Sequence, residues 1–466
     1  MKKIIFNIMA VSLVMTSFTS CKKYLDDVAT NPNNPSEVSP NALLANIELA
    51  TFSNYNGNLN RRAAVLTNHM AGEDGQFVAI ANYQINEGDV TNEWSTIYDG
   101  ALINCHILSE KFGAKSPYFN GMAKVLKAMN LGLATDMWGD VPNRDAYQAL
   151  QRNFTPKYDD QQTVLQDIQT MLSEAITDLS KPLSSNLYTP GGYDYIYHGD
   201  PEKWIGAAYA LKARYANRLS KRDPNKSATD AIAYLDSAYA HGFTATAADA
   251  NATFGMNGNE NNQWYAFENQ RTGYLKMGDY FIKLMKTNSD PRLPYFAGLD
   301  DHGAYTGADN NPYEISYDES PLGPFYGSPQ SKAPIITYVE AKFIEAECKL
   351  RAGNGAGAAI AHNDAVRTSV LDVTGSLDSA FVADYASETA STLDLTIIIK
   401  QKYVALFTQA ETWADWRRTG IPKLVVNDQG VLNEYPRILP TPKDERNCNP
   451  YAPSITNLLT RVWWDK

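Results

Sequence analysis

Apolar residues recur at three- and four-residue spacing along much of the chain, a pattern typical of helices that bury one face. In the stretch that starts at Pro201 they fall on one helical face: Trp204, Ala207, Ala208, Leu211, Tyr215 and Leu219. The stretch 338–350 repeats the pattern at Ala341, Ile344 and Cys348. A capping residue before a proline marks two helix starts, Ser116-Pro117 and Asp200-Pro201. The pattern predicts a mainly α-helical protein.

The predicted helices fall into pairs, near residues 117–180, 200–241, 334–372 and 391–419. Segment 231–236 resembles segment 359–364, and the step Leu-Lys-Ala occurs at both 126–128 and 211–213. Paired helices with small residues at their crossings are similar to tetratricopeptide units. Because one such hairpin cannot bury its own apolar face, we expect the pairs to stack into a scaffold.

Long stretches without periodicity separate these pairs, at residues 72–90, 182–199, 243–272 and 290–333. Loops of this length in a compact protein are usually functional. We therefore expect one domain over residues 41–466, with a second, irregular lobe of long loops mainly at 243–333. These loops carry many aromatic rings: Phe77, Tyr83, Tyr188, Tyr193, Tyr195, Tyr197, Trp264, Tyr265, Phe267, Tyr305, Tyr313, Tyr317 and Tyr326.

The N-terminus has the features of an export signal. Lys2 and Lys3 precede an apolar stretch that is too short to span a bilayer, and small residues lead to Cys21. This order is similar to a bacterial lipobox, in which the cysteine is acylated. We expect residues 1–20 to be a lipoprotein signal peptide and residues 21–40 a lipid-anchored tether.

Composition and charge narrow the possible functions. The chain of 466 residues has 41 Lys plus Arg and 52 Asp plus Glu, which gives a net charge of −11. Because nucleic-acid affinity comes mostly from cations that neutralise phosphates, we expect no nucleic-acid partner. The chain contains no HExxH, GxSxG or P-loop motif, and the glycine-rich run at 353–358 follows a predicted helix where a dinucleotide site needs a strand. We expect no catalysis, no cofactor and no metal.

Some charged and sulfur-bearing residues have two interpretations. Paired carboxylates can serve glycoside hydrolysis, but for Asp136/Asp140 and Glu345/Glu347 we favour helix capping and turn bonding. For Arg417 and Arg418 we favour structural ion pairs over an anion site. Oxygen ligands suit calcium, yet EF-hand spacing is absent from the set Asp300, Asp301, Asp309 and Asn310. We expect buried free thiols at Cys105, Cys348 and Cys448.

Motifs in order along the chain carry a resemblance to a known family. The start resembles a lipobox with its tether at Ser20 to Asp26 and Asn31-Pro32-Asn33. A W-x3-Y-x5-N helix is matched by Trp94, Tyr98 and Asn104, and a turn motif by 136–142, DMWGDVP. Residues 345–353 read EAECKLRAG, and residues 363–367 read NDAVR. The C-terminal third adds WADWRRTGIP at 413–422, RILP at 437–440, Asn449-Pro450 and VWWDK at 462–466.

These motifs together resemble the SusD/RagB family of surface lipoproteins from Bacteroidetes, over nearly the whole chain. The resemblance implies a tetratricopeptide-type scaffold, an outward-facing location on the outer membrane and a SusC-like TonB-dependent transporter as partner. It implies capture of a nutrient, here a glycan, without chemistry. One departure is the sequence 410–412, AET, where many members carry Gly-x-Arg.

The family resemblance also points to the ligand site, in the loop before the W-x3-Y helix and in the central insertion. An aromatic ring can cover the flat face of a sugar while polar side chains bond its hydroxyls. The candidates are Asp74, Gln76, Phe77, Asn82, Tyr83, Asn261, Gln263, Trp264, Tyr265 and Arg271. Each ring can instead pack its own loop. Two other functions stay open: peptide uptake, as in RagB-like members, and a structural lid of the transporter without a small ligand.

Overall fold

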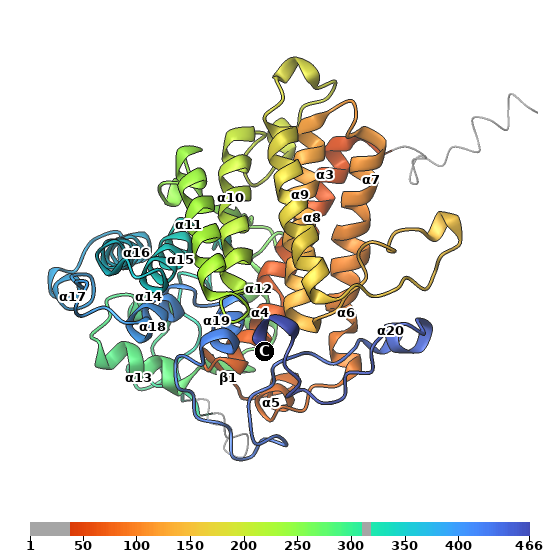
Figure 1. Cartoon of the computed structure of the whole chain (residues 1–466). Coiled ribbons are helices and arrows are strands. Elements are labelled where there is room, and N and C mark those ends of the chain that lie inside the picture. Colours follow the sequence, from red (N-terminus) through yellow and green to blue (C-terminus); the bar gives the residue numbers. More distant parts are fainter. Residues whose placement is uncertain (1–37, 310–317) are drawn as a thin grey trace, which may run out of the picture.

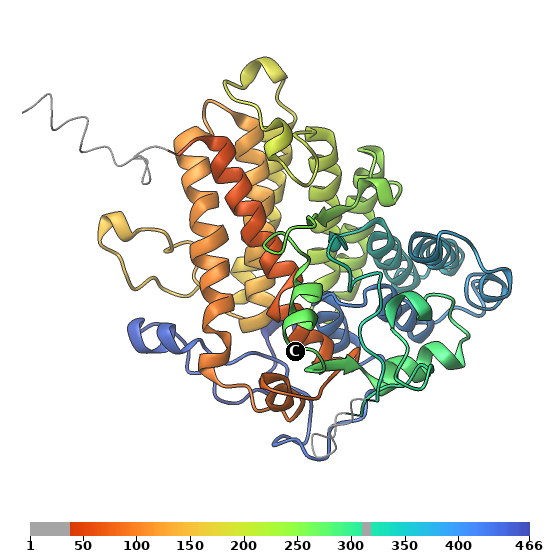
Figure 2. The same ribbon diagram turned by 180° about the vertical axis from the view of Figure 1, so that it is seen from behind.

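The computed structural model of the protein describes residues 38–309 and 318–466, and helices dominate it (Figures 1 and 2). The predicted mainly helical fold with an irregular lobe is confirmed. The longer helices are α3 (Pro40–Asn56), α7 (Ile103–Phe112), α8 (Pro117–Trp138), α9 (Gln161–Leu179), α10 (Pro201–Arg218), α11 (Pro224–Ala240), α15 (Tyr338–Arg351), α16 (Gly355–Thr374) and α18 (Leu395–Ala405). The shorter ones are α4 (Asn58–Leu66), α5 (Gln76–Ala81), α6 (Thr91–Ser95), α12 (Gln263–Gln270), α13 (Asp279–Thr287), α14 (Leu293–Phe296), α17 (Ser379–Tyr385), α19 (Glu411–Thr419) and α20 (Lys443–Cys448).

Three helical hairpins, α8/α9, α10/α11 and α15/α16, form the scaffold (Figure 1). Their ends follow local chemistry. The Asp200 carboxylate accepts hydrogen bonds from the Glu202 and Lys203 amides ahead of α10, and Asp223 caps α11 through the Lys226 amide. The Asn354 side chain accepts from the Gly357 amide at the start of α16. These caps satisfy amides that have no partner inside the helix.

The hairpins stack through close helix crossings. Helix α9 packs on α10, and α11 packs on α15, so the three hairpins form a continuous layer. Small residues permit the contact between neighbouring helices. A Cβ added at Gly132 of α8 would lie 2.0 Å from the Tyr215 hydroxyl of α10, and one at Gly121 would lie 2.5 Å from the Leu179 side chain of α9.

The segment 391–419 contains two helices that pack on different neighbours. Helix α18 lies on α15 and α16, whereas α19 lies against α4 near the start of the described chain. An ion pair joins the two helices, with Lys402 Nζ 2.6 Å from Asp415 Oδ2. The C-terminal third therefore connects the last hairpin to the N-terminal helices.

Two short antiparallel ribbons organise the irregular lobe. Strand β1 (Met70–Gly72) pairs with β3 (Leu275–Met277), and β2 (Ala250–Ala252) pairs with β4 (Ala333–Ile336). The first ribbon brings the loop after α4 beside the central insertion. The second returns the chain to α15, so the lobe is fixed to the scaffold at both ends (Figure 2).

The DMWGDVP turn packs against the W-x3-Y helix. The Trp94 ring stacks on Tyr98 with centroids 4.4 Å apart and meets Trp138 edge-on at 5.2 Å. The Tyr98 hydroxyl donates to the Pro142 carbonyl at 2.9 Å, and the Asp140 carboxylate accepts from the Gln161 amide at the start of α9. This motif therefore joins the α6–α7 region to the first hairpin.

A set of buried charges, here called the α10 charge cluster, joins four helices. Its members are Asp136, Arg214, Arg218, Glu340 and Glu411. Arg214 Nε donates to Glu340 Oε1 at 2.6 Å, and Arg218 Nη2 lies 3.0 Å from Asp136 Oδ2 and 2.6 Å from Glu411 Oε2. The Asp136 carboxylate thus acts as an ion-pair partner of Arg218 that stabilises the fold.

Candidate functional site

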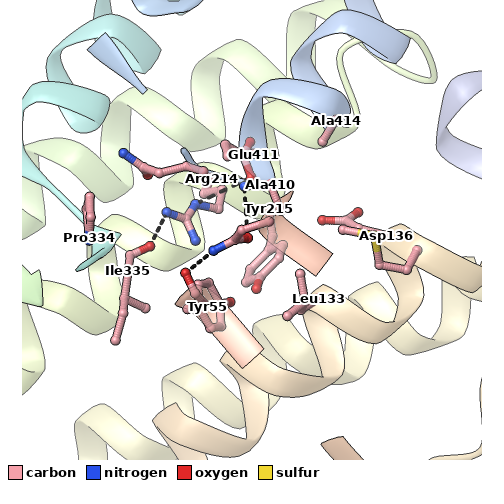
Figure 3. A pocket seen from close by; sticks show the side chains of 13 residues that line it. Tyr55, Leu133, Asp136, Arg214, Tyr215, Pro334, Ile335, Ala410, Glu411 and Ala414 are labelled. Atoms are coloured by element: carbon pink, nitrogen blue, oxygen red, sulfur yellow. Dashed lines mark hydrogen bonds and ion pairs between the residues drawn. The ribbon is translucent and has the colours of Figure 1, made fainter. Parts of the chain in front are cut away.

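The α10 charge cluster borders a small internal cavity (Figure 3). Its volume is about 20 Å³, enough for about one water molecule. Arg214, Glu411 and Tyr215 point toward it, and Arg214 also donates to the Ile335 carbonyl at 2.6 Å. A cavity of this size is too small for a ligand larger than a water molecule.

Three of the rings predicted to form the ligand platform are buried. Phe77 is 1% exposed, and Tyr83 and Trp264 are each 2% exposed. Phe77 meets the Phe267 ring edge-on at 5.3 Å, and the Arg61 guanidinium lies over the Trp264 ring at 5.9 Å. Burial leaves these rings no free face for a sugar; they hold their own segments in place.

The structure does bring two of the predicted segments together. The β1–β3 ribbon and the Phe77–Phe267 contact place α5 beside α12. The Glu73 amide donates to the Tyr274 carbonyl at 3.0 Å, which closes the turn between them. Gly75 sits in this turn with φ 54°, and a Cβ there would meet the Tyr274 ring at 2.3 Å.

The polar candidates in these segments differ in exposure and in partners. Gln76 and Arg271 are exposed, and Asp74, Asn261, Gln263 and Tyr265 are half-buried. Asn261 Nδ2 donates to the Gly255 carbonyl at 3.0 Å, and Gln263 Nε2 donates to Ser53 Oγ at 3.1 Å. Asp74 accepts from the Gly75 amide at 2.6 Å. Asn261 and Asp74 therefore already bond within their own loops, and Gln263 bonds to helix α3.

Asn82 and Tyr83 lie against a different part of the chain, residues 425–435. The Tyr83 hydroxyl accepts from the Asn427 amide at 2.9 Å, and the Tyr83 ring lies 5.3 Å from that of Tyr435. Asn427 Nδ2 donates to the Ala81 carbonyl and to Asn82 Oδ1, at 2.9 and 3.1 Å. The loop predicted to carry ligand residues thus supports this C-terminal segment.

A pocket of about 440 Å³, here called the α13 pocket, opens beside that segment. Its size lies within the usual range for small-molecule sites, about 300–1,000 Å³. It is lined by Asn68, Asp279, Tyr280, Lys283, Ala308, Asp309, Val425, Val426, Asn427 and Asp428. A half-buried tyrosine ring, three carboxylates and one amine therefore surround one hollow.

Charge and exposure in the α13 pocket suit a polar ligand. Lys283 pairs with Asp279 at 2.7 Å, while Asp309 and Asp428 are exposed. Val425 is 82% exposed, so an apolar ledge borders the polar groups. Tyr280 packs edge-on against Tyr403 at 6.1 Å, which fixes its ring, and burial raises the pKa of its hydroxyl. The phenol therefore stays neutral and free to hydrogen-bond.

Sequence reasoning did not identify most of this pocket. Asp309 belongs to the residues considered for calcium, and Tyr280, Lys283 and Asp428 carry no local sequence signal. The pocket forms because residues 279–283 meet residues 425–428, far along the chain. The one sequence signal was an apolar run, Leu424-Val425-Val426, inside a polar loop.

Several other predictions fall on residues with a clear structural role. Asp300 accepts hydrogen bonds from the His302 and Ala304 amides and from the Thr306 hydroxyl, so it shapes a turn. Asn310 lies outside the described residues. Residues 38–309 and 318–466 hold no group of three or more His, Cys, Asp or Glu side chains placed to bind a metal ion.

Cys105 and Cys348 are buried free thiols, whereas the prediction of burial is wrong for Cys448 at the end of α20, which is exposed. Cys21 lies outside the described part of the chain. Within that part, no helix has both the length and the apolar character needed to cross a bilayer.

Stacked helical hairpins that carry an irregular lobe with a polar pocket define a SusD-like scaffold. The chain belongs to the SusD-like family: residues 32–440 match SusD-like_2, described as "Starch-binding associating with outer membrane". The SusD/RagB resemblance is thereby confirmed. No curated protein is detectably similar to the chain.

Solved structures share the fold at low sequence identity. A SusD/RagB family protein from Bacteroides thetaiotaomicron is 23% identical, with a TM-score of 0.76 over 92% of this chain and 99% of its own. A chitin-binding SusD homologue from Flavobacterium johnsoniae is 21% identical, with a TM-score of 0.77 over 91% and 98%. A SusD homologue from Bacteroides fragilis is 19% identical, with a TM-score of 0.75 over 92% and 100%.

Proposed function

We propose that the protein is a surface lipoprotein of the outer membrane that binds a glycan in the α13 pocket and passes it to a transporter. The observation that carries the proposal is the pocket itself, in which the Tyr280 ring lies among Asp279, Asp309 and Asp428. The family description, which names starch binding and the outer membrane, supports the ligand class and the location. A relative of the same fold is described as chitin-binding.

Binding would follow from the chemistry of a pyranose. The Tyr280 ring can cover the apolar C–H face of the sugar, and Val425 extends that apolar wall. Carboxylates of Asp309 and Asp428 can accept from hydroxyl groups, and Lys283 can donate. Such contacts hold and release a sugar without making or breaking a bond, so we propose capture and no catalysis.

Isothermal titration with a panel of soluble oligosaccharides tests the pocket. Tyr280→Ala should weaken binding about three- to tenfold, the usual value of an aromatic contact. Asp428→Ala should weaken it by tenfold or more, because it removes a charged hydrogen-bond acceptor. The controls are Tyr193→Ala and Asp236→Ala, at exposed side chains outside the pocket. Unchanged affinity in both pocket variants would contradict the assignment.

The anchor and the partner belong to the same proposal. Acylation at Cys21 would hold the protein on the membrane, and a SusC-like TonB-dependent transporter would receive the ligand. Labelled palmitate should enter the wild-type protein but not Cys21→Ala, and a barrel protein should co-purify with the wild type. An unacylated, freely released wild-type protein would contradict the anchor.

Peptide binding is the second candidate, and the charge of the α13 pocket favours it for basic peptides. Three carboxylates face one amine there, so a cationic side chain would be attracted. A competition experiment with glycans and lysine-rich peptides separates the two. If a lysine-rich peptide displaces the bound glycan at the same salt concentration and binds more tightly than the glycan, the result would favour peptide binding.

A further inference from the structure

A second pocket lies on another part of the irregular lobe, between the β2–β4 ribbon and helices α16 and α18. It has a volume of about 420 Å³ and is here called the β4 pocket. Its lining is Thr246, Ala247, Asp249, Asn251, Phe325, Tyr326, Lys332, Pro334, Thr337, Val339, Ser369, Asp372, Val373, Ala405 and Gln409. None of these residues lines the α13 pocket.

Two buried polar side chains at this pocket have no hydrogen-bond partner among the described residues. Tyr326 and Gln409 are each 6% exposed. The Tyr326 ring is held by stacking on Phe296 at 5.7 Å and by the edge of Phe407 at 5.8 Å, so its hydroxyl is fixed in place. Neither the hydroxyl nor the Gln409 amide is fully enclosed, so both reach open space. Gln409 also lines the small cavity beside the α10 charge cluster.

Unsatisfied buried polar groups cost free energy unless a partner arrives. A hydroxyl and a primary amide together supply donors and acceptors of both kinds. Because both groups reach the open pocket, a ligand rich in hydroxyls can replace solvent there and form hydrogen bonds of both kinds with them. The lining therefore indicates a ligand of matching chemistry.

The rim of the β4 pocket adds charged groups and one aromatic face. Asp249 Oδ1 accepts from the Tyr338 amide at 2.6 Å, and Oδ2 has no partner among the described residues. Burial raises the pKa of Asp249, and Lys332 opposes this shift. Phe325 is half-buried, and Lys332 and Asp372 are exposed. Two carboxylates face one amine here, so the lining disfavours an anion.

We propose that the β4 pocket is a second carbohydrate site, which takes a neutral sugar of one or two residues. The Tyr326 hydroxyl, the Gln409 amide and Asp249 Oδ2 bond its hydroxyl groups, and the Phe325 ring covers one face. This site is separate from the α13 pocket and uses no residue of it. The protein thus holds a second, short sugar while a glycan occupies the first site.

The test uses the purified protein carrying Tyr280→Ala and Asp428→Ala, which disable the α13 pocket; this double variant is the background protein. The probes are glucose, N-acetylglucosamine, maltose and N,N′-diacetylchitobiose. Saturation-transfer NMR detects their binding, and titration measures their affinity. At least one probe should bind this background protein. Adding Tyr326→Phe and Gln409→Met should weaken that binding about tenfold or more, because both changes keep volume and remove hydrogen bonds.

Two controls make the result specific to the pocket. Tyr193→Phe removes an exposed hydroxyl elsewhere and should leave binding unchanged. Hydrogen exchange should slow on probe binding in residues 249–252 and 325–337. Thermal melting of each variant checks that the fold is intact.

The proposal fails if no probe binds the background protein, or if binding persists unchanged in Tyr326→Phe/Gln409→Met. The α13 pocket is tested separately, because the effect of Tyr280→Ala and Asp428→Ala is measured as a loss of affinity for longer glycans relative to the wild-type protein. Loss of one site therefore does not decide the other.

Discussion

Glu347 and Arg418 form a buried two-point ion pair although 71 positions separate them. Arg418 Nη2 donates to Glu347 Oε2 at 2.7 Å, and a second contact joins Nη1 to Oε1. Glu347 lies in EAECKLRAG on α15 and Arg418 in WADWRRTG on α19. Two motifs recognised separately in the sequence thus meet as partners.

Removing one partner of this pair should destabilise the protein strongly. Glu347→Gln leaves the buried Arg418 with Asp415 as its remaining carboxylate partner, and removing one partner of a buried ion pair costs about 3–5 kcal/mol. Urea unfolding measures the change. Arg144→Ala serves as control, because its pair with Asp167 is largely exposed and solvent screening should leave stability almost unchanged. A loss below about 1 kcal/mol in Glu347→Gln would contradict the buried pair.

Stability should fall as the pH drops below 6.5, because two histidines are buried in neutral form. Burial lowers the pKa of His69 to about 3 and of His362 to about 4, from an ordinary value of 6.5. Below 6.5 the unfolded chain binds protons that the folded protein does not, so each histidine contributes a loss of about 1.4 kcal/mol per pH unit.

The variant His69→Gln should remove one of these two contributions between pH 6.5 and 5. His69 Nε2 lies 2.9 Å from the Tyr403 carbonyl, and glutamine can still donate there. Unfolding at several pH values gives the slope. His302→Gln, at an exposed side chain, should leave it unchanged. If the unfolding free energy changes with pH equally in His69→Gln and in the wild type, His69 is not held in the neutral form by burial.

Trp264→Ala should lower stability and spare the ligand affinity of the molecules that remain folded. The ring is 2% exposed, and loss of a buried aromatic side chain costs about 3–5 kcal/mol. Thermal melting and titration of the same sample separate the two effects. Reduced affinity with an unchanged melting temperature would instead indicate that Trp264 contacts the ligand.

Gly132→Ala should destabilise the scaffold by about 1–3 kcal/mol, although alanine favours helices over glycine. The added methyl group would overlap the Tyr215 hydroxyl, which lies 2.0 Å from the Cβ position. Gly88→Ala is the matched control, since no atom lies within 4 Å of a Cβ there. A Gly132→Ala protein at least as stable as wild type would mean that α8 and α10 are less tightly packed.

The helical scaffold was predictable because amphipathic periodicity and proline-marked starts are local signals. Pro117, Pro201 and the apolar face from Trp204 to Tyr215 all lie where the structure places α8 and α10. Helix α17 gave no such signal, because its seven residues are too few to show a period. Local patterns also do not reveal that α19 packs on α4.

The candidate site was less predictable, for two physical reasons. An aromatic residue in a loop has the same sequence signature whether it faces solvent or anchors the loop, and Phe77, Tyr83 and Trp264 anchor theirs. The α13 pocket arises because Tyr280 and Asp428, far apart in the sequence, line the same hollow, and no spacing along the chain encodes that approach. Asn82, one of the residues to which the resemblance points, accepts a hydrogen bond from Asn427 in the wall of that pocket.

The α10 charge cluster has a consequence for how the molecule loses its structure. Arrays of stacked repeats usually fray from an end, since each unit contacts only its neighbours. Here the guanidinium groups of Arg214 and Arg218 fasten α10 to α8, α15 and α19 at once. A peripheral hairpin cannot open without exposing one of those charges, so the whole assembly should melt in a single cooperative transition.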